Sequence, residues 1–119
     1  MIIGIGIDIV EIDRIEHAAI QRQRFLERIF TPAELKYCLS KSQPYQCLAA
    51  RFAAKEAVFK AVGRLLSWCE VEIVNKQDIG LKAHFYGRAK QIVGSDKEVL
   101  ITISHSQRYA VAYAMMLKK

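Results

Sequence analysis

The sequence predicts an α+β fold in which helices pack on a largely antiparallel sheet. Two observations favour this class. Residues alternate with period two near both ends of the chain, at 2–10 and again within 98–116, which is typical of β-strands. Between them, an alanine-rich segment runs from about 45 to 62 and stops at Gly63, a residue type that often ends helices. With 119 residues, we expect a single domain spanning 1–119.

The first predicted strand, at 2–10, has two different faces. One face carries four isoleucines, Ile3, Ile5, Ile7 and Ile9. The other face carries Gly4, Gly6 and Asp8. We expect the isoleucine face to belong to the core. The glycines leave room beside Asp8 for the close approach of another backbone or of a ligand.

Helices are predicted after this strand. Asp13 and Glu16 fit a capping box, so we expect a helix to start near Arg14. Thr31 and Glu34 fit a second capping box with a proline between them, which predicts a short helix to about residue 41. The first helix is expected to continue through this apolar stripe: Ile12, Ile15, Ala19, Leu26, Ile29 and Phe30.

The rest of the chain completes the α+β pattern. A break at 42–44 precedes the long helix of about 45–62. The remaining expected elements are strands at 69–75 and 81–86 joined by a turn at 78–80, a short helix at about 87–93, and strands at 98–104 and 108–116 joined by a tight turn at 105–107.

Composition narrows the classes of partner. The chain carries 18 Lys and Arg against 12 Asp and Glu, a net charge of +6, which favours nucleic acid, phosphorylated small molecules or acidic proteins. No dense basic run supports nucleic acid, and no run approaches the roughly 20 apolar residues of a membrane span. We expect neither a secretory leader nor membrane contact.

The cysteines indicate a reducing compartment. Cys38, Cys47 and Cys69 are odd in number and show no CxxC spacing. We therefore expect neither a disulfide framework nor a zinc site, and a cytoplasmic location.

Two carboxylates in apolar surroundings are candidate metal ligands. Asp8 lies in the isoleucine-rich strand, and Glu56 lies among Ala, Val and Phe of the long helix, with Lys60 one turn further on. An isolated buried carboxylate is costly unless it is paired, protonated or bound to a metal. Two carboxylates suit Mg²⁺, which keeps waters and takes other oxygens from a bound phosphate. The simpler interpretations are a solvated strand face and an ordinary surface Glu–Lys pair.

His105, between Ser104 and Ser106 at a predicted strand end, is either a polar turn residue or a ligand contact or base. No GxSxG segment supports a serine nucleophile, and the GxG of GIGID lacks the third glycine of a dinucleotide site.

The first helix also carries a polar, mainly cationic stripe. It consists of Arg14, His17, Gln21, Arg24 and Arg28, with Phe25 at its border. It is either a solvated helix face or a docking surface for an acidic protein.

Four segments together resemble one family, the holo-acyl carrier protein synthases, which are small bacterial 4′-phosphopantetheinyl transferases. These segments are GIGIDIVEIDRI, RIFTPAEL, RFAAKEAVFKAVG and ITISHSQRYAVAYA, and they cover most of the chain in order. The resemblance implies a 4′-phosphopantetheinyl transferase-like α+β fold. It also implies transfer of 4′-phosphopantetheine from coenzyme A to a serine of apo-acyl carrier protein, in fatty acid biosynthesis, with release of adenosine 3′,5′-bisphosphate.

The resemblance further implies roles for individual residues. Asp8 and Glu56 would hold Mg²⁺ against the pyrophosphate, and Lys60 would contact phosphate. Ser104 and His105 would line the coenzyme A site. The carrier protein would meet Arg14, Arg24, Phe25 and Arg28. A homotrimer with active sites between protomers is also implied.

The sequence departs from the family pattern after the long helix and near the expected turn. Residues 64–67 replace a glycine-rich loop, and 80–82 replace a Gly-Xaa-Pro turn; the first change affects the expected wall of the coenzyme A site. Glu56, a metal-bound water and His105 all remain candidates for the base.

Two other functions remain as alternatives. One is a small basic nucleic-acid-binding module. The other is an oligomerising subunit whose glycine-faced strand packs on its own copy.

Overall fold

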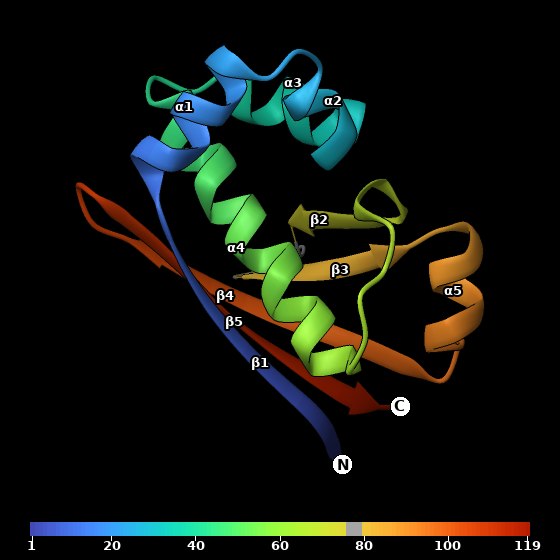
Figure 1. Ribbon diagram of the computed structural model, residues 1–119. Helices are drawn as coiled ribbons and strands as arrows, with labels where there is room; N and C mark the ends of the chain where they lie inside the picture. Colours follow the sequence, from blue (N-terminus) through green and yellow to red (C-terminus); the bar gives the residue numbers. More distant parts are fainter. Residues whose placement is uncertain (76–79) are drawn as a thin grey trace.

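The computed structural model describes residues 1–75 and 80–119 as helices packed on one sheet (Figure 1). The strands are β1 (Ile2–Glu11), β2 (Val71–Asn75), β3 (Leu81–Phe85), β4 (Lys97–His105) and β5 (Tyr109–Lys118). The helices are α1 (Ile12–Gln21), α2 (Phe25–Ile29), α3 (Pro32–Leu39), α4 (Pro44–Val62) and α5 (Gly87–Val93), with a 3-10 turn η1 (Trp68–Glu70) before β2.

The sheet has the order β1-β5-β4-β3-β2, and every neighbouring pair is antiparallel. The predicted fold class is therefore confirmed. Helix α4 crosses one face of the sheet, while α1, α2 and α3 gather at one end of it (Figure 1). Asp8 of β1 is opposite Ala112 of β5, which in turn is opposite Ile103 of β4.

The two faces of β1 are the reverse of the expectation. Gly4 and Gly6 face α4, because a Cβ at either position would collide with the backbone carbonyl of Ala61 or Ala57. The isoleucines point to the open side and are 42–64% exposed, at Ile3, Ile5, Ile7 and Ile9. The prediction of an isoleucine core was wrong because a period-two pattern separates two faces without saying which one meets the helix.

The core lies between α4 and the glycine side of the sheet. Helix α4 fits there because its small side chains let the two backbones approach closely. Its fully buried residues include Leu48, Ala53, Ala57 and Val58, which pack with Val99 of β4. As predicted, the helix ends at Gly63, whose φ of 93° suits a left-handed C-terminal cap.

The expected first helix is two helices. Helix α1 ends at Gln21, and α2 starts after Arg24, whose φ is 66°. The Asp13–Glu16 capping box was also wrong: α1 begins at Ile12 and has no side-chain cap. The capping box at Thr31 and Glu34 is confirmed at the start of α3, with both of its hydrogen bonds present.

The cysteine expectation needs one correction. Cys38 of α3 and Cys47 of α4 form a disulfide, and only Cys69 is free. The sequence spacing concealed this pair, because the short loop between α3 and α4 brings the two Cα atoms to 5.3 Å.

The second half of the chain follows the predicted order. The expected strand at 69–75 is divided into η1 and β2. The strand at 81–86, the helix at 87–93 and the final hairpin are confirmed to within a few residues. Most of the turn predicted at 78–80 lies outside the described residues. Among the described helices, none is both long and apolar enough to cross a membrane.

Candidate active site

A cavity of about 460 Å³ lies where β1, α1 and α4 meet. Asp8 and Glu56 line it together, although they come from a strand and a helix far apart in the sequence. The remaining wall is supplied by Ile9, Val10, Arg14, Ile15, His17, Ala18, Gln21, Arg22, Phe25 and Phe52. One end of the cavity is thus acidic, and much of the wall beside it is apolar or basic.

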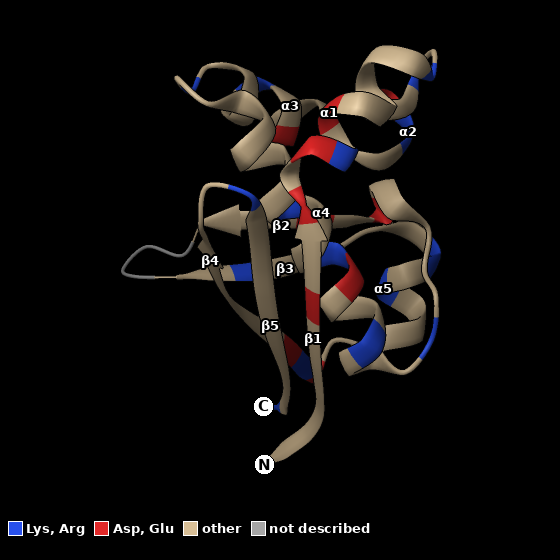
Figure 2. Cartoon of the chain, turned by 60° about the vertical axis from the view of Figure 1, so that its left-hand side comes forward, with Lys and Arg blue, Asp and Glu red and all other residues tan. Residues whose placement is uncertain are grey.

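Asp8 and Glu56 are held in an environment that disfavours their charged forms. Burial raises the pKa of Asp8, although the neighbouring Lys60 opposes this shift. Burial also raises the pKa of Glu56, and the negative charge of Asp8 raises it further. A cation between the two carboxylates would remove both penalties. Figure 2 shows acidic segments of β1 and α4 beside a basic segment of α4.

The donor set suits a metal that needs few protein ligands. Within residues 1–75 and 80–119, three or more His, Cys, Asp or Glu side chains nowhere gather in a potential metal cluster. Two carboxylates fit Mg²⁺ better than Ca²⁺, because Mg²⁺ commonly keeps waters and completes its octahedron with phosphate oxygens.

Lys60 belongs to this site through Asp8. Its Nζ lies 3.4 Å from Asp8 Oδ1 and donates a hydrogen bond of 2.8 Å to the carbonyl of Ile7. The Lys60 side chain is 56% exposed, whereas that of Asp8 is 16% exposed. The ammonium can therefore contact a ligand while it remains attached to β1. An ordinary Glu56–Lys60 surface pair does not describe this arrangement.

The cationic stripe of the sequence is divided by the break between α1 and α2. Arg14 and Phe25 line the cavity, and the charge of Arg14 lowers the pKa of Glu56, against the larger effects that raise it. Arg24 and Arg28 are exposed beside the cavity, and Arg24 pairs with Glu27 at 3.4 Å. The inference that Arg14 and Arg24 share one helix face was wrong, because α1 ends before Arg24.

Ser104 and His105 do not reach this cavity within one chain. Strand β5 lies between β4 and β1, so His105 is two strands away from Val10. His105 instead lines a second cavity of about 360 Å³, together with Lys41 and Arg51. Ser104 is exposed on the opposite side of the sheet, in register with Ile9.

Sequence reasoning missed the cationic wall of this second cavity. Arg51 is only 5% exposed, and its guanidinium lies over the ring of Tyr37, 4.8 Å from the centroid. Lys41 lies over the same ring at 4.3 Å. A single arginine within the alanine-rich helix was the available signal, since a buried arginine requires partners.

Comparisons with known proteins agree on one family. The family model described as the 4′-phosphopantetheinyl transferase superfamily matches residues 4–114. A holo-[acyl-carrier-protein] synthase of Moorella thermoacetica is 44% identical, over 93% of this chain and 91% of its own. One from Chlamydia trachomatis serovar L2 is 46% identical, over 94% of this chain and 97% of its own.

Solved structures give the same result. The holo-(acyl-carrier-protein) synthase of Bacillus anthracis in complex with CoA (3′,5′-ADP) has a TM-score of 0.82 at 34% identity, covering 100% of this chain and 99% of that one. The Plasmodium yoelii holo-ACP-synthase has a TM-score of 0.86 at 28% identity, covering 100% and 97%.

Proposed function

Because this chain belongs to the 4′-phosphopantetheinyl transferase superfamily, among its holo-[acyl-carrier-protein] synthases, we propose that it transfers phosphopantetheine in the cavity between β1, α1 and α4. The chain transfers 4′-phosphopantetheine from coenzyme A to a serine of apo-acyl carrier protein. The products are holo-carrier protein and adenosine 3′,5′-bisphosphate. The observation that carries the proposal is the meeting of Asp8 and Glu56 in one cavity.

Asp8 and Glu56 would hold Mg²⁺. Both carboxylates have raised pKa values, with burial as the main cause, and the repulsion between them adds to the shift of Glu56. When bound, the metal neutralises charge on the pyrophosphate and polarises its oxygens.

Lys60 would position the pyrophosphate. Its Nζ is anchored to the Ile7 carbonyl and to Asp8, so the ammonium charge is already positioned next to Asp8 before the substrate binds. The lysine stabilises negative charge on phosphate oxygens as the bond to the leaving group breaks.

The serine hydroxyl of the carrier must lose a proton as it attacks. Glu56 is well placed to accept it, directly or through a water, because it lines the cavity. His105 lines a different cavity of the same chain and would need a second protomer to approach.

A homotrimer with active sites between protomers would bring the two cavities together. The exposed isoleucine face of β1 is an unusual apolar surface for a free chain. This face continues onto β5, where partly exposed side chains are in register with the isoleucines: Val111, Tyr113 and Met115. If a neighbour packs there, its His105 cavity, with Lys41 and Arg51, can take the remaining phosphate of coenzyme A.

The carrier protein would dock at α1 and α2. Arg14, Arg24 and Arg28 supply positive charge there, and Phe25 supplies an apolar contact at the cavity wall. Acidic partners are recognised in this way, with the charges governing encounter and specificity.

The proposed setting is fatty acid biosynthesis in the cytoplasm. Because Cys38 and Cys47 form a disulfide, the cysteines no longer indicate a reducing compartment. The proposed location therefore rests on the family alone. Cell fractionation with detection of the chain tests it.

Mass spectrometry of the carrier protein tests the proposed reaction. Apo-acyl carrier protein, coenzyme A, Mg²⁺ and the chain are incubated together, and the expected carrier mass increases by one phosphopantetheine. Two controls are a carrier whose acceptor serine is replaced by alanine and a reaction with EDTA. An unchanged carrier mass in the complete reaction would refute the proposal, and full activity in EDTA would refute the metal assignment.

A further inference from the structure

Helix α2 is too short to be stable by itself. It spans Phe25–Ile29, only five residues, and it follows Arg24 in the left-handed conformation. Forming one isolated helical turn is unfavourable, so such a turn needs outside contacts. The carbonyl groups at its C-terminal end also lack partners within the helix.

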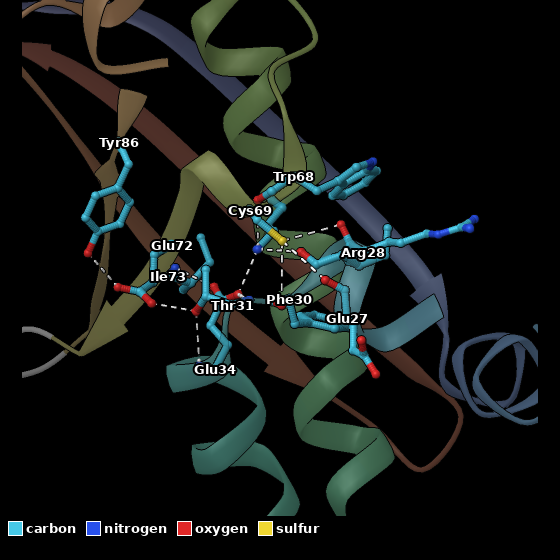
Figure 3. A network of polar contacts seen from close by, with 12 residues as sticks. Glu27, Arg28, Phe30, Thr31, Glu34, Trp68, Cys69, Glu72, Ile73 and Tyr86 are labelled. Carbon is cyan, nitrogen blue, oxygen red and sulfur yellow. Dashed lines mark hydrogen bonds and ion pairs between the residues drawn. The ribbon is translucent and has the colours of Figure 1, made fainter. Parts of the chain in front are cut away.

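A thiol meets part of this end. The Sγ of Cys69, in η1, lies 3.5 Å from the carbonyl oxygens of Glu27 and Arg28, and 3.6 Å from that of Phe30 (Figure 3). The single S–H proton donates to one of these oxygens at a time. Burial raises the pKa of Cys69, which keeps the thiol protonated and able to donate.

A buried ammonium meets the remaining carbonyl. The Nζ of Lys55 donates a hydrogen bond of 2.7 Å to the carbonyl of Ile29 and one of 2.9 Å to that of Trp68. Glu34 neutralises its charge at 2.7 Å, and both side chains are at most 1% exposed. A positive charge at the C-terminal end of a helix is favourable. Because Trp68 precedes Cys69, Lys55 also fixes the turn that carries the thiol.

We propose that Lys55 and Cys69 are positioning residues that cap α2 and hold its docking surface in place for the carrier protein. This inference rests on the proposed role of Phe25 and Arg28 in carrier binding. These two residues lie on α2 itself, while the capping groups come from α4 and η1. Through this cap, the buried Lys55–Glu34 ion pair contacts the helix that would meet the carrier, and Lys55 directly precedes Glu56 in the sequence.

Hydrogen exchange tests the cap without any reference to activity. The amides of Arg28 and Phe30 donate within this turn, to the carbonyls of Arg24 and Leu26, at 3.1 and 2.9 Å. In Cys69→Ala we expect their exchange to accelerate about three- to tenfold, the effect of one lost hydrogen bond. Cys69→Ser keeps a donor at the same position and should restore protection. Cys69 is exposed as a residue and its thiol is only partly buried, so neither variant disturbs the core.

Steady-state kinetics test the positioning role. Only molecules with α2 in place bind the carrier, so the carrier KM should rise in Cys69→Ala, by at most the three- to tenfold factor of the exchange rates, and should rise further in Lys55→Met, with an unchanged coenzyme A KM. Should Lys55→Met not fold, the Cys69 variants decide the matter.

Three results would overturn the inference. They are wild-type exchange at both amides in Cys69→Ala, faster exchange with a wild-type carrier KM, and equal increases in both KM values. Failure of the proposed function is distinguishable, because the wild-type chain itself would then leave the carrier unmodified.

Discussion

Gly6→Ala should separate the two halves of the proposed active site, Asp8 on β1 and Glu56 on α4. A Cβ at Gly6 would collide with the carbonyl oxygen of Ala57 and would lie 2.9 Å from the backbone nitrogen of Ala61. Both atoms belong to the backbone of α4, so no side-chain rotation relieves the contact. The helix and strand β1 must therefore move apart.

The size of this movement determines the expected decrease in kcat. Restoring ordinary van der Waals distances requires a shift on the order of 1 Å. Asp8 is two residues from the substitution, and Glu56 is adjacent to Ala57, so the shift appears directly in the spacing of the two carboxylates. A misplacement of about 1 Å can lower kcat by roughly 100-fold. Overpacking should cost about 1–3 kcal/mol of unfolding free energy.

A matched control separates misplacement from general destabilisation. Gly94 has a φ of 87°, and a Cβ there meets only two side-chain ends, Asp96 Oδ1 at 3.1 Å and Lys97 Nζ at 3.6 Å. Gly94→Ala should thus lose a similar stability, about 1–3 kcal/mol, while α4 and β1 stay in place.

The assay is the initial rate of holo-carrier formation at saturating substrates, measured below both melting temperatures. We expect Gly6→Ala to lose roughly 100-fold in kcat and Gly94→Ala to remain close to wild type. Equal kcat values for the two variants, at comparable loss of stability, would show that the glycines of β1 do not set the carboxylate spacing.

Three further predictions address the remaining parts of the proposal. The native pKa values of Asp8 and Glu56 are raised, so the stability gained by protonating them is present at low pH and lost as pH rises through those native values. Glu56→Gln and Asp8→Asn should therefore each raise the melting temperature in EDTA at neutral pH. Each should also nearly abolish transfer when Mg²⁺ is present. A lower melting temperature would contradict the raised pKa values of the two carboxylates. Arg14→Glu with Arg24→Glu should raise the carrier KM, leave the coenzyme A KM unchanged and lose its effect with added salt, whereas a wild-type carrier KM would leave both arginines without a docking role. Ile7→Asp should dissociate the proposed homotrimer, as measured by light scattering, because Ile7 is 59% exposed on the apolar face; a monomeric, active wild-type chain would refute the trimer.

Local patterns predicted much of this fold. The period-two segments became β1, β4 and β5 because alternation and β-propensity depend on neighbours along the chain. Thr31 and Glu34 formed their capping box for the same reason, since both hydrogen bonds close within one turn. Asp8 and Glu56 could be selected because a carboxylate in an apolar segment is costly wherever the segment packs.

Features that depend on contacts between distant segments could not be predicted in this way. The apolar stripe continued past residue 22, but the left-handed Arg24 turned the chain, and no sequence signal marked it. The Cys38–Cys47 disulfide depends on how α3 and α4 approach each other. His105 and Asp8 were assigned to one site, yet within a chain β5 separates their strands.

The orientation of β1, which differs from the predicted isoleucine core, is connected with the geometry of the proposed site. Aspartate has a short side chain, so Asp8 and Glu56 can share one cation only if strand and helix backbones lie unusually close. Gly4 and Gly6 provide that closeness, which means that the glycine face must be the inner one. The isoleucines are then forced outward by the same alternation. The close approach that would assemble the proposed metal site therefore also creates the apolar face on which we propose that a neighbouring protomer packs, so both proposed functions of this strand follow from a single packing requirement.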